Sequence, residues 1–453
     1  MIISNRIRII ENKAQLSSCG VENTKKVIIA GASAAGLYAA YKLGKAGMKV
    51  TVYEKNGYDN LCYDWHDSIN ENLIKILGFE IGEVDAYLKD EDTVYIMHGS
   101  EKIINLKSKE KRYGVNRRSL VHFLFKKASE YADIKFKTEI TAPIITDNKV
   151  TGLVCNGIKY YADLVIDNLG VFSPLRASLP ESFGFEKGTD GDIMCSYRAC
   201  FNVNEGKLPN IKSKLYLRYL GKNDITWVIA ENGVVDIFIG HVGGLSMNEA
   251  QETLTKLRQE NDIIGNNLIY GGGIYHIPVR YPASKLYCDG YVLLGGSGFM
   301  TNPLTGSGLY ASVLAADILC KTISGGDFSL NNLYNYQKQF IQCFGKFYYE
   351  IDVIRRFLLN VDIRYLAYII DKNIISEEDV NNARNNLPLN MTFTVIASKL
   401  SKGLRKPLFL MKVLRLYNKI LAIRKAVNNM PEGYDEKLLI SWRTEIEELF
   451  NKL

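Results

Sequence analysis

Two kinds of signal are missing from this chain of 453 residues: paired cysteines and long apolar runs. Its eight cysteines are scattered, and neither a C-x-x-C pair nor an H-E-x-x-H motif occurs, so we predict no metal site. Every apolar stretch is interrupted before about 18 residues, which argues against a transmembrane helix. The opening MIISNRIRII lacks the apolar core of a secretory signal, and scattered cysteines without such a signal favour a cytoplasmic protein.

A strong charge bias is also absent. The net charge of +7 is too small to indicate a nucleic-acid partner, and 47% hydrophobic residues are enough for a sizeable core. Basic residues do gather in one C-terminal stretch, SKLSKGLRKPLFLMKVLRLYNKILAIRKAV, with apolar residues at helical spacing. A helix packed on the body with a solvated basic face is the simpler interpretation. The alternative is a surface that meets an anionic membrane or a lipid phosphate.

The clearest positive signal is VIIAGASAAGLYAAYKLGKAGMKVTVYEK, over residues 27–55. It predicts a strand, a glycine turn, a helix and a second strand that ends in an acid. Gly31 permits the tight turn, Gly36 permits close packing of helix and strand, and Ser33 and Ala35 are small enough for a pyrophosphate to approach. Glu54 is placed to bind a ribose hydroxyl and would repel a 2′-phosphate, so FAD or NAD is favoured over NADP.

Three later motifs favour FAD over NAD. YGVNRRSLVHFLFKKA places Arg117 at the start of a helix, DLVIDNLGVFSPLR contains Gly170, and GYVLLGGSGFMTNPLTGSGLYAS combines a buried strand, a glycine-rich turn and an apolar helix. Their order and spacing resemble the flavoprotein group that includes aromatic hydroxylases and geranylgeranyl reductases. In that group, the segment that matches NPLTGSGL directs backbone N–H groups at the flavin ring.

The resemblance extends along nearly the whole chain. GGSGFMTNPLTGSG, IDVIRRFLLN, IISEEDV and SWRTEIEELF are similar to archaeal-type geranylgeranyl reductases, which use FAD to saturate isoprenoid double bonds of lipid precursors. The resemblance implies FAD as the cofactor. The cofactor-binding residues that the motifs and the resemblance predict are Gly31, Ser33, Ala35, Gly36, Glu54, Lys55, Arg117, Gly170, Gly295, Gly296, Ser297, Pro303, Thr305, Gly306, Ser307, Gly308 and Leu309.

The predicted fold class is α/β: a Rossmann-like FAD-binding domain, an antiparallel-sheet substrate domain and a C-terminal helical region. Alternating β-branched and aromatic residues between about 190 and 285 support the antiparallel sheet. The predicted boundaries are an N-terminal extension over 1–24, an FAD-binding domain over 25–185 and 286–331 with part of the substrate cap within 60–110, a substrate domain over 186–285 and a helical region over 332–453.

The chain departs from the family pattern at three places. Gly-Gly stands at Gly295–Gly296 where the family has Gly-Asp, and Leu169 replaces an Asp before Gly170. The family's Y-x-W-x-F-P pattern appears only as ITWVIA, which keeps Trp227. Ser297 and backbone groups are candidates to replace the missing carboxylates. The predicted substrate-binding residues are Trp65, Tyr216 and Trp227.

The loop NLCYDWHDSINENLIKILGF follows the first nucleotide motif and is dense in proton-transfer groups. Cys62 stands where many relatives have the Cys of P-C-G-[DE], and Asp64 matches the acid. Reduction of an alkene needs a hydride on one carbon and a proton on the other. We therefore predict that Cys62, Asp64 or His66 supplies or relays that proton.

The function that the resemblance implies is an FAD-dependent reductase of C=C bonds in isoprenoid chains or a related apolar alkene. Expected partners are an apolar lipid, a membrane surface at the inner face of the cell membrane, and an electron donor such as ferredoxin or NAD(P)H. Two alternatives remain open. One is a flavin-dependent monooxygenase, which shares the FAD motifs, and the other is a lipid-binding relative without catalysis.

Overall fold

The protein is described from a computed structural model. The described residues are 24–89, 93–97, 103–106, 111–207, 213–222, 224–372, 374, 376–384, 387, 395, 398–399, 401 and 406–451, with side chains at 93–97, 103–106, 224, 370 and 384 left aside. Residues 1–23 of the expected N-terminal extension lie outside this set.

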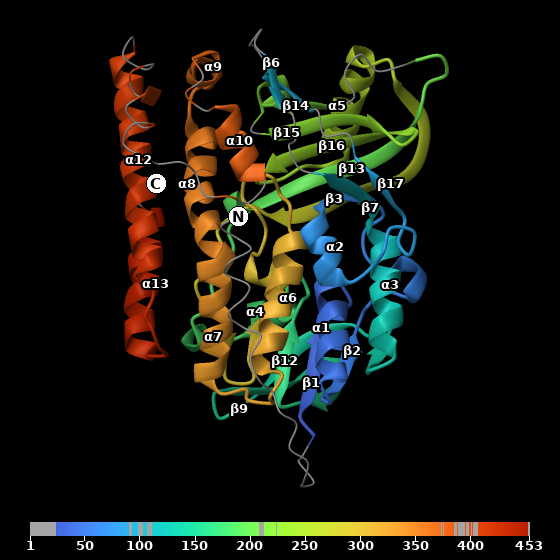
Figure 1. Cartoon of the computed structure of the whole chain (residues 1–453), viewed down its shortest axis with the longest axis vertical. Coiled ribbons are helices and arrows are strands. Elements are labelled where there is room, and N and C mark those ends of the chain that lie inside the picture. Colours follow the sequence, from blue (N-terminus) through green and yellow to red (C-terminus); the bar gives the residue numbers. More distant parts are fainter. Residues whose placement is uncertain are drawn as a thin grey trace.

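A six-stranded sheet with mostly parallel strands forms one end of the molecule (Figure 1). Its central strand is a buried apolar run, as parallel strands covered on both faces require. Helices α1 (Ala34–Lys45), α3 (Arg117–Ser129) and α6 (Leu309–Ile323) lie beside one another, with α1 in contact with both others. The strands, in spatial order, are β18 (Tyr287–Cys288), β19 (Tyr291–Leu293), β12 (Leu164–Asp167), β1 (Lys26–Ala30), β2 (Lys49–Tyr53) and β8 (Ala132–Lys135).

A seven-stranded sheet forms the other end. Its strands pair antiparallel, apart from the parallel pair β14–β5. Tyr197, Ala199 and Phe201 of β13 pack on one face with helix α5 (Met247–Glu260), and the alternate residues face the interior of the molecule. The strands, in spatial order, are β17 (Ile264–Pro278), β13 (Ile193–Val203), β16 (Val234–Val242), β15 (Asp224–Glu231), β14 (Ser213–Leu217), β5 (Thr93–Met97) and β6 (Ile103–Leu106).

Smaller elements connect these two sheets. A three-stranded sheet contains β3 (His66–Asn70), β7 (Arg112–Asn116) and β4 (Ala86–Leu88). Helix α2 (Glu71–Leu77) directly follows β3 in the chain and packs against it. A second one contains β9 (Ile140–Thr146), β10 (Lys149–Cys155) and β11 (Ile158–Tyr161). The remaining short helical segments are α4 (Pro174–Ser178) and 3₁₀ turns at Tyr58–Asn60, Glu181–Phe183, Asp190–Asp192, Tyr219–Gly221 and Gly295–Gly298.

The C-terminal helices run along one side of both sheets (Figure 1). Helix α7 continues through a π-helical turn into α8, and α12 packs against α8 and α13. The helices are α7 (Leu330–Phe340), the π-helical turn Ile341–Gly345, α8 (Lys346–Asn360), α9 (Ile363–Asp371), α10 (Glu377–Arg384), α12 (Pro407–Asn428) and α13 (Glu436–Asn451).

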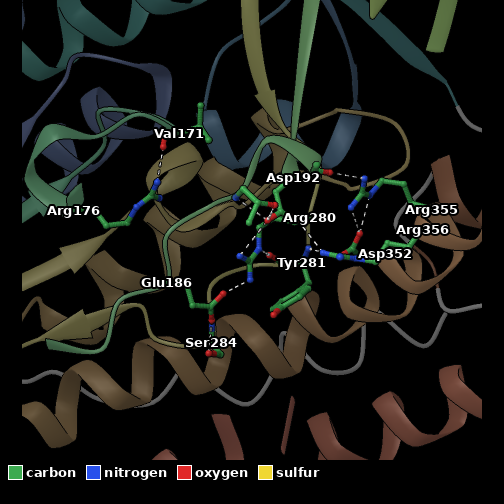
Figure 2. Close-up of polar contacts among 12 residues, drawn as sticks. Val171, Arg176, Glu186, Asp192, Arg280, Tyr281, Ser284, Asp352, Arg355 and Arg356 are labelled. Carbon is green, nitrogen blue, oxygen red and sulfur yellow. Dashed lines mark hydrogen bonds and ion pairs between the residues drawn. The ribbon is translucent and has the colours of Figure 1, made fainter. Parts of the chain in front are cut away.

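A buried set of charges joins α8 to the end of the seven-stranded sheet, and Figure 2 shows how its side chains converge. Asp352 accepts hydrogen bonds from Arg355 Nε at 2.7 Å and from Arg356 Nε at 3.1 Å. Arg356 also donates to Asp192 at 2.9 Å, and Arg280 pairs with Glu186. We call this set the junction cluster: Glu186, Asp192, Arg280, Asp352, Arg355 and Arg356.

Candidate active site

One cavity of about 2820 Å³ extends from the glycine loops of the nucleotide sheet to the inner face of the seven-stranded sheet. Sites for a single small ligand usually enclose roughly 300–1,000 Å³. The cavity therefore has room for a large cofactor together with a second ligand. We call its two ends the cofactor groove and the chamber, where the chamber is lined by Trp65, Arg198, Leu215, Trp227, Ile229, Asp236, Phe238 and Ile274.

The cofactor groove begins at the turn after β1. Gly31 has φ +97°, and an added Cβ would lie 2.8 Å from the carbonyl oxygen of Asn168, so only glycine fits there. The side-chain amide of Asn168 donates to the Ser33 hydroxyl at 2.6 Å. Ser33 is therefore accommodated by a residue that directly follows the neighbouring strand β12, and the residues from Gly31 to Ala35 line the cavity at the start of α1.

Glu54 lies at the end of β2, beside this turn. Its carboxylate accepts hydrogen bonds from the backbone N–H of Ala32 at 3.0 Å and of Asn56 at 2.8 Å. These bonds hold the carboxylate in the cavity wall, where oxygen lone pairs remain for ribose hydroxyls. The turn, the helix start and Glu54 together fit the adenosine and pyrophosphate end of FAD.

The loop before α6 forms the other wall of the groove. The side-chain oxygen of Asn302 accepts from the backbone N–H of Leu304 at 3.0 Å and of Thr305 at 3.1 Å, which shapes the turn. Gly306 has φ +69°, and residues 305–309 line the cavity at the helix start. These backbone groups fit the flavin end of FAD.

The structure gives a physical reason for the missing carboxylate at Gly296. A Cβ at this position would lie 3.1 Å from the Cα of Gly170, so the two glycines approach each other too closely for an added side chain without a shift. Ser297 does not replace the carboxylate. Its hydroxyl is buried and donates to the backbone oxygens of Asp167 at 2.5 Å and Leu294 at 2.9 Å, away from the cavity.

Arg117 starts α3, but its guanidinium is engaged by a residue that sequence reasoning missed. Asp67 of β3 accepts a hydrogen bond from Arg117, and both side chains line the cavity. Arg117 also lies near Cys62. Burial raises the pKa of the Cys62 thiol, and the Arg117 guanidinium partly opposes this shift. Cys62 therefore keeps its proton near neutral pH and faces the cavity as a thiol.

The loop candidates divide into two groups. Cys62, Trp65 and His66 line the cavity, whereas Asp64 pairs with Arg118 at 3.4 Å on the outer side of the loop. This placement is a correction to the prediction for Asp64, because the ion pair with Arg118 of α3 holds its carboxylate away from the cavity. Cys62 has φ +62°, a left-handed conformation that non-glycine residues rarely adopt.

His66 connects the cavity to solvent. Its Nδ1 lies 2.9 Å from the hydroxyl of Tyr270, and its Nε2 lies 3.9 Å from Oδ2 of Asp85, whose side chain is 63% exposed. Burial lowers the pKa of His66, an effect that Asp85 partly opposes. The imidazole is thus neutral near pH 7, with one ring nitrogen near an exposed carboxylate and the other near a phenol.

The inner face of the seven-stranded sheet supplies the chamber. Leu215 pairs with Trp227 across β14 and β15, and Trp227 stacks on Phe238 with ring centroids 4.0 Å apart. Tyr216 instead packs on the opposite face with α5, and its hydroxyl donates to Asn261 at 3.3 Å. The predicted substrate contact at Tyr216 is therefore corrected, because side chains alternate along a strand and Leu215 takes the inward position.

A buried ion pair inside the chamber was also missed from the sequence. Arg198 of β13 donates from Nη2 to Asp236 at 2.6 Å and from Nε at 3.1 Å. The two residues are 38 positions apart, on neighbouring strands, and no short motif contains both. The only sequence signal is a charged residue at an inward position of each strand.

The predicted residues can be sorted by this cavity. Those that line it are Gly31, Ser33, Ala35, Glu54, Lys55, Cys62, Trp65, His66, Arg117, Gly170, Trp227, Gly296, Thr305, Gly306, Ser307, Gly308 and Leu309. Those that lie outside its lining are Gly36, Asp64, Tyr216, Gly295, Ser297 and Pro303. Gly36 still contributes to the turn, because a Cβ there would lie 2.4 Å from the Gly31 carbonyl oxygen.

In the described part of the chain, no group of three or more His, Cys, Asp or Glu side chains is arranged to hold a metal ion. None of the helices described is both long and apolar enough to cross a membrane.

Comparison with known proteins agrees with this geometry. Residues 29–67 match the family of NAD(P)-binding Rossmann-like domains. The chain is 24% identical to a digeranylgeranylglycerophospholipid reductase of Sulfolobus acidocaldarius, over 94% of this chain and 98% of the relative. A reductase of the same name from Methanococcus vannielii is 23% identical, over 86% of this chain and 98% of that protein.

A solved structure has the same fold. It is a geranylgeranyl bacteriochlorophyll reductase-like protein of Thermoplasma acidophilum, with a TM-score of 0.67 and 17% identity over 87% of this chain and 99% of that one. The α/β fold class and the resemblance to geranylgeranyl reductases are thereby confirmed. The findings also support FAD as the cofactor of a flavin-dependent oxidoreductase.

Proposed function

We infer that the protein is an FAD-dependent reductase that saturates C=C bonds of isoprenoid lipid chains or of a closely related apolar alkene. The observation that carries this inference is the single cavity, which joins the cofactor groove to an aromatic and aliphatic chamber. An apolar chain that enters the chamber can extend to the flavin end of the groove. The names of the curated relatives support the same substrate class.

The residues of the chain would divide the work as follows. The turn at Gly31 and the carboxylate of Glu54 hold the nucleotide end of FAD, and the loop over residues 305–309 holds the flavin end. When bound, FAD supplies the hydride chemistry. Trp227 and Phe238 exclude water from the chamber and orient the apolar chain.

Proton delivery is assigned to the two loop residues that face the cavity. Cys62 holds a thiol proton there, because burial raises its pKa. His66 connects the same cavity to the exposed carboxylate of Asp85, which suits a relay that restores the proton from solvent. Asp64 has no place in this step, since it pairs with Arg118 outside the cavity. Electrons come from an external donor such as ferredoxin or NAD(P)H.

The test begins with the absorbance spectrum of the purified protein, which should contain a bound flavin. The protein is then reduced with dithionite without oxygen and mixed with geranylgeraniol, and mass spectrometry should show products heavier by two hydrogens per reduced bond. Full recovery of the unreacted alkene across several prenyl chain lengths and head groups would refute the reductase. A product that carries an oxygen atom from O₂ would identify a monooxygenase instead.

Cys62→Ala separates chemistry from cofactor binding. We expect turnover to fall by about 10²-fold or more, as removal of a general acid usually does, while flavin content stays near that of the wild-type protein. Cys195→Ala makes the same change on the face of β13 that packs with α5, away from the cavity lining, and is the control variant. Equal losses of flavin and turnover in Cys62→Ala would make Cys62 a structural residue.

A membrane surface is the expected source of the lipid, and α12 is the candidate contact. It contains five Lys or Arg and no Asp or Glu, and it forms the outer layer of the C-terminal helices (Figure 1). Leu408 is 73% exposed and Met411 is 51% exposed on the same helix. A basic helix with exposed apolar side chains suits an anionic bilayer.

Sedimentation with phosphatidylglycerol vesicles tests this contact. Lys412→Glu/Arg415→Glu should reduce the bound fraction strongly. Lys126→Glu/Lys256→Glu makes a similar change of net charge at exposed positions of α3 and α5 and should reduce it less. Equal losses in both double variants would show that net charge alone, and not α12, controls binding.

A further inference from the structure

Arg198 lies at the centre of the chamber wall, between two tryptophans. Its guanidinium carbon is 5.0 Å from the ring centroid of Trp65 and 5.4 Å from that of Trp227. Only 12% of its side chain is exposed, and that part faces the cavity. Asp236 and the backbone oxygen of His66, which accepts from Nη2 at 2.8 Å, fix its orientation. Arg198 is therefore a rigid donor, held before any ligand arrives.

The hydrogen bonds of Arg198 leave part of its donor capacity unused. Its bonds to Asp236 and His66 engage Nε and both hydrogens of Nη2. Within the described part of the chain, Nη1 has no acceptor. The indole N–H groups of Trp65 and Trp227 also lack partners among the described residues. Of these donors, Nη1 of Arg198 is the one that a ligand in the cavity can reach, and an oxygen there would accept a charge-assisted hydrogen bond.

The local charge decides what kind of oxygen fits. The carboxylate of Asp236 already neutralises Arg198, and Asp67 neutralises Arg117, whose guanidinium carbon also lies 5.6 Å from the centroid of the Trp65 ring. A phosphate at Nη1 would gain little net attraction and would lie near the carboxylate of Asp236. A hydroxyl, ether or carbonyl oxygen accepts the same hydrogen bond without adding charge.

The position of Arg198 along β13 gives its distance from the loop over residues 305–309, which we call the flavin loop. Met194 abuts the loop, because a Cβ at Gly306 would lie 3.3 Å from its Cε. Arg198 is four residues further along the same face of the strand, which corresponds to about 13 Å. An oxygen bound at Arg198 therefore leaves an apolar segment of chain to cover the distance to the flavin loop.

We propose that Arg198, with Trp65 and Trp227, forms a subsite for a neutral oxygen atom near one end of the apolar substrate. The substrate class is thus a prenyl alcohol, ether or ketone, with its uncharged oxygen inside the chamber. The proposal rests on the proposed function for the identity of the chain but concerns binding, which can be measured without turnover.

Intrinsic fluorescence provides that measurement, because two of the three tryptophans of the chain flank Arg198. The flavin-loaded protein is titrated in detergent with geranylgeraniol, geranylgeranyl diphosphate and the corresponding hydrocarbon without oxygen. Arg198→Met/Asp236→Leu removes the donor and its counter-ion together, so no unpaired charge remains. Arg258→Met is the matched control: it lies over the Phe201 ring at 4.6 Å on the opposite face of the same sheet.

The wild-type protein should bind geranylgeraniol about tenfold more tightly than the hydrocarbon, the effect of one hydrogen bond. The double variant should lose this preference and keep its affinity for the hydrocarbon, and Arg258→Met should behave as wild type. Tighter binding of the diphosphate than of the alcohol in the wild-type protein would overturn the proposal, and so would an unchanged preference in the double variant. If the expected preferences appear but dithionite-reduced protein leaves geranylgeraniol unreacted, the reductase function fails while the subsite stands.

Discussion

The chamber and the junction cluster are built from the same chemistry, buried arginines paired with carboxylates, yet they have different uses. In the junction cluster, Arg355 donates to Asp352 and to the backbone oxygen of Gly191, so that its charge and its donors serve contacts between segments. In the chamber, Arg198 has a carboxylate partner but retains unused donors beside a cavity. Both sites contain an arginine–carboxylate ion pair. What distinguishes the ligand site from the structural contact is a hydrogen-bond donor of the arginine that faces a cavity and has no acceptor among the residues that the structure describes.

The largest effect is expected at the junction cluster. Asp352→Ala removes the carboxylate partner of Arg355 and one of the two carboxylate partners of Arg356, at a site where the Asp352 side chain is fully buried. We expect the free energy of unfolding to fall by about 3–5 kcal/mol, the usual result of breaking a buried ion pair. Urea denaturation followed by circular dichroism measures this loss.

Asp362→Ala is the control for that variant. Asp362 pairs with Arg364 at 2.9 Å near the start of α9, where the Arg364 side chain is largely exposed. Its removal should lower the free energy of unfolding only slightly, because the exposed pair adds little stability. That small loss comes from the hydrogen bond that Asp362 accepts from the backbone N–H of Arg364 at 2.8 Å, which caps α9. Similar midpoints for both variants would show that the junction cluster does not hold α8 to the sheet.

A smaller effect is expected in the chamber, where the Asp236 side chain borders the cavity and is 12% exposed. Asp236→Ala alone should destabilise by about 1–3 kcal/mol, because it leaves the Arg198 charge unpaired. Arg198→Met/Asp236→Leu should recover most of that loss, since apolar side chains of similar size replace the pair. The same denaturation experiment compares the two. Failure of the double variant to recover stability would mean that the pair itself is structural, as in the junction cluster.

The smallest effect concerns pH. The pKa of His66 is lowered by burial, with Arg198 acting in the same direction and Asp85, Asp236 and Glu231 opposing it. A lowered pKa in the folded state means that the unfolded chain binds the proton more readily. Stability from neutral His66 is therefore complete above about pH 6.5 and decreases as the pH falls below it.

His66→Gln tests this sign by removing the titrating group while keeping a polar side chain. Between pH 7.5 and 5.5, its unfolding free energy should decrease less than that of the wild-type protein. His122→Gln changes a histidine on α3 that stacks on Tyr58, outside the cavity lining, and serves as the comparison. A steeper decrease in His66→Gln would indicate that the folded state stabilises the protonated imidazole.

The cofactor groove was the part best predicted from sequence, because backbone requirements leave short motifs. Gly31, Glu54 and the loop at Gly306 act through turns, helix starts and strand ends, all of which are local in the chain. The fold class followed from the order of these motifs. These motifs do not indicate which side chains of distant strands contact one another.

The chamber was predicted less well for that reason. Trp227 lines it as expected, but Tyr216 faces the other way, since one step along a strand reverses the direction of the side chain. Asp67 and Asp236 become visible only when distant strands are paired in space. The sequence also did not indicate the direction of the Ser297 hydroxyl. Ser297 lies beside a predicted cofactor loop, yet its hydroxyl bonds to the backbone oxygens of Asp167 in β12 and of Leu294.

The left-handed backbone conformation of Cys62 favours glycine for stability, whereas the proposed proton transfer requires cysteine. A non-glycine residue in this conformation carries a penalty of roughly 1–2 kcal/mol that glycine avoids. Replacement of Cys62 by glycine would therefore stabilise the folded protein and at the same time remove the thiol. In a lineage that no longer needs proton transfer at this loop, the substitution of Cys62 by glycine would be favoured by stability alone. Under the proposed function, retention of cysteine at this position would distinguish relatives that catalyse reduction from relatives that only bind.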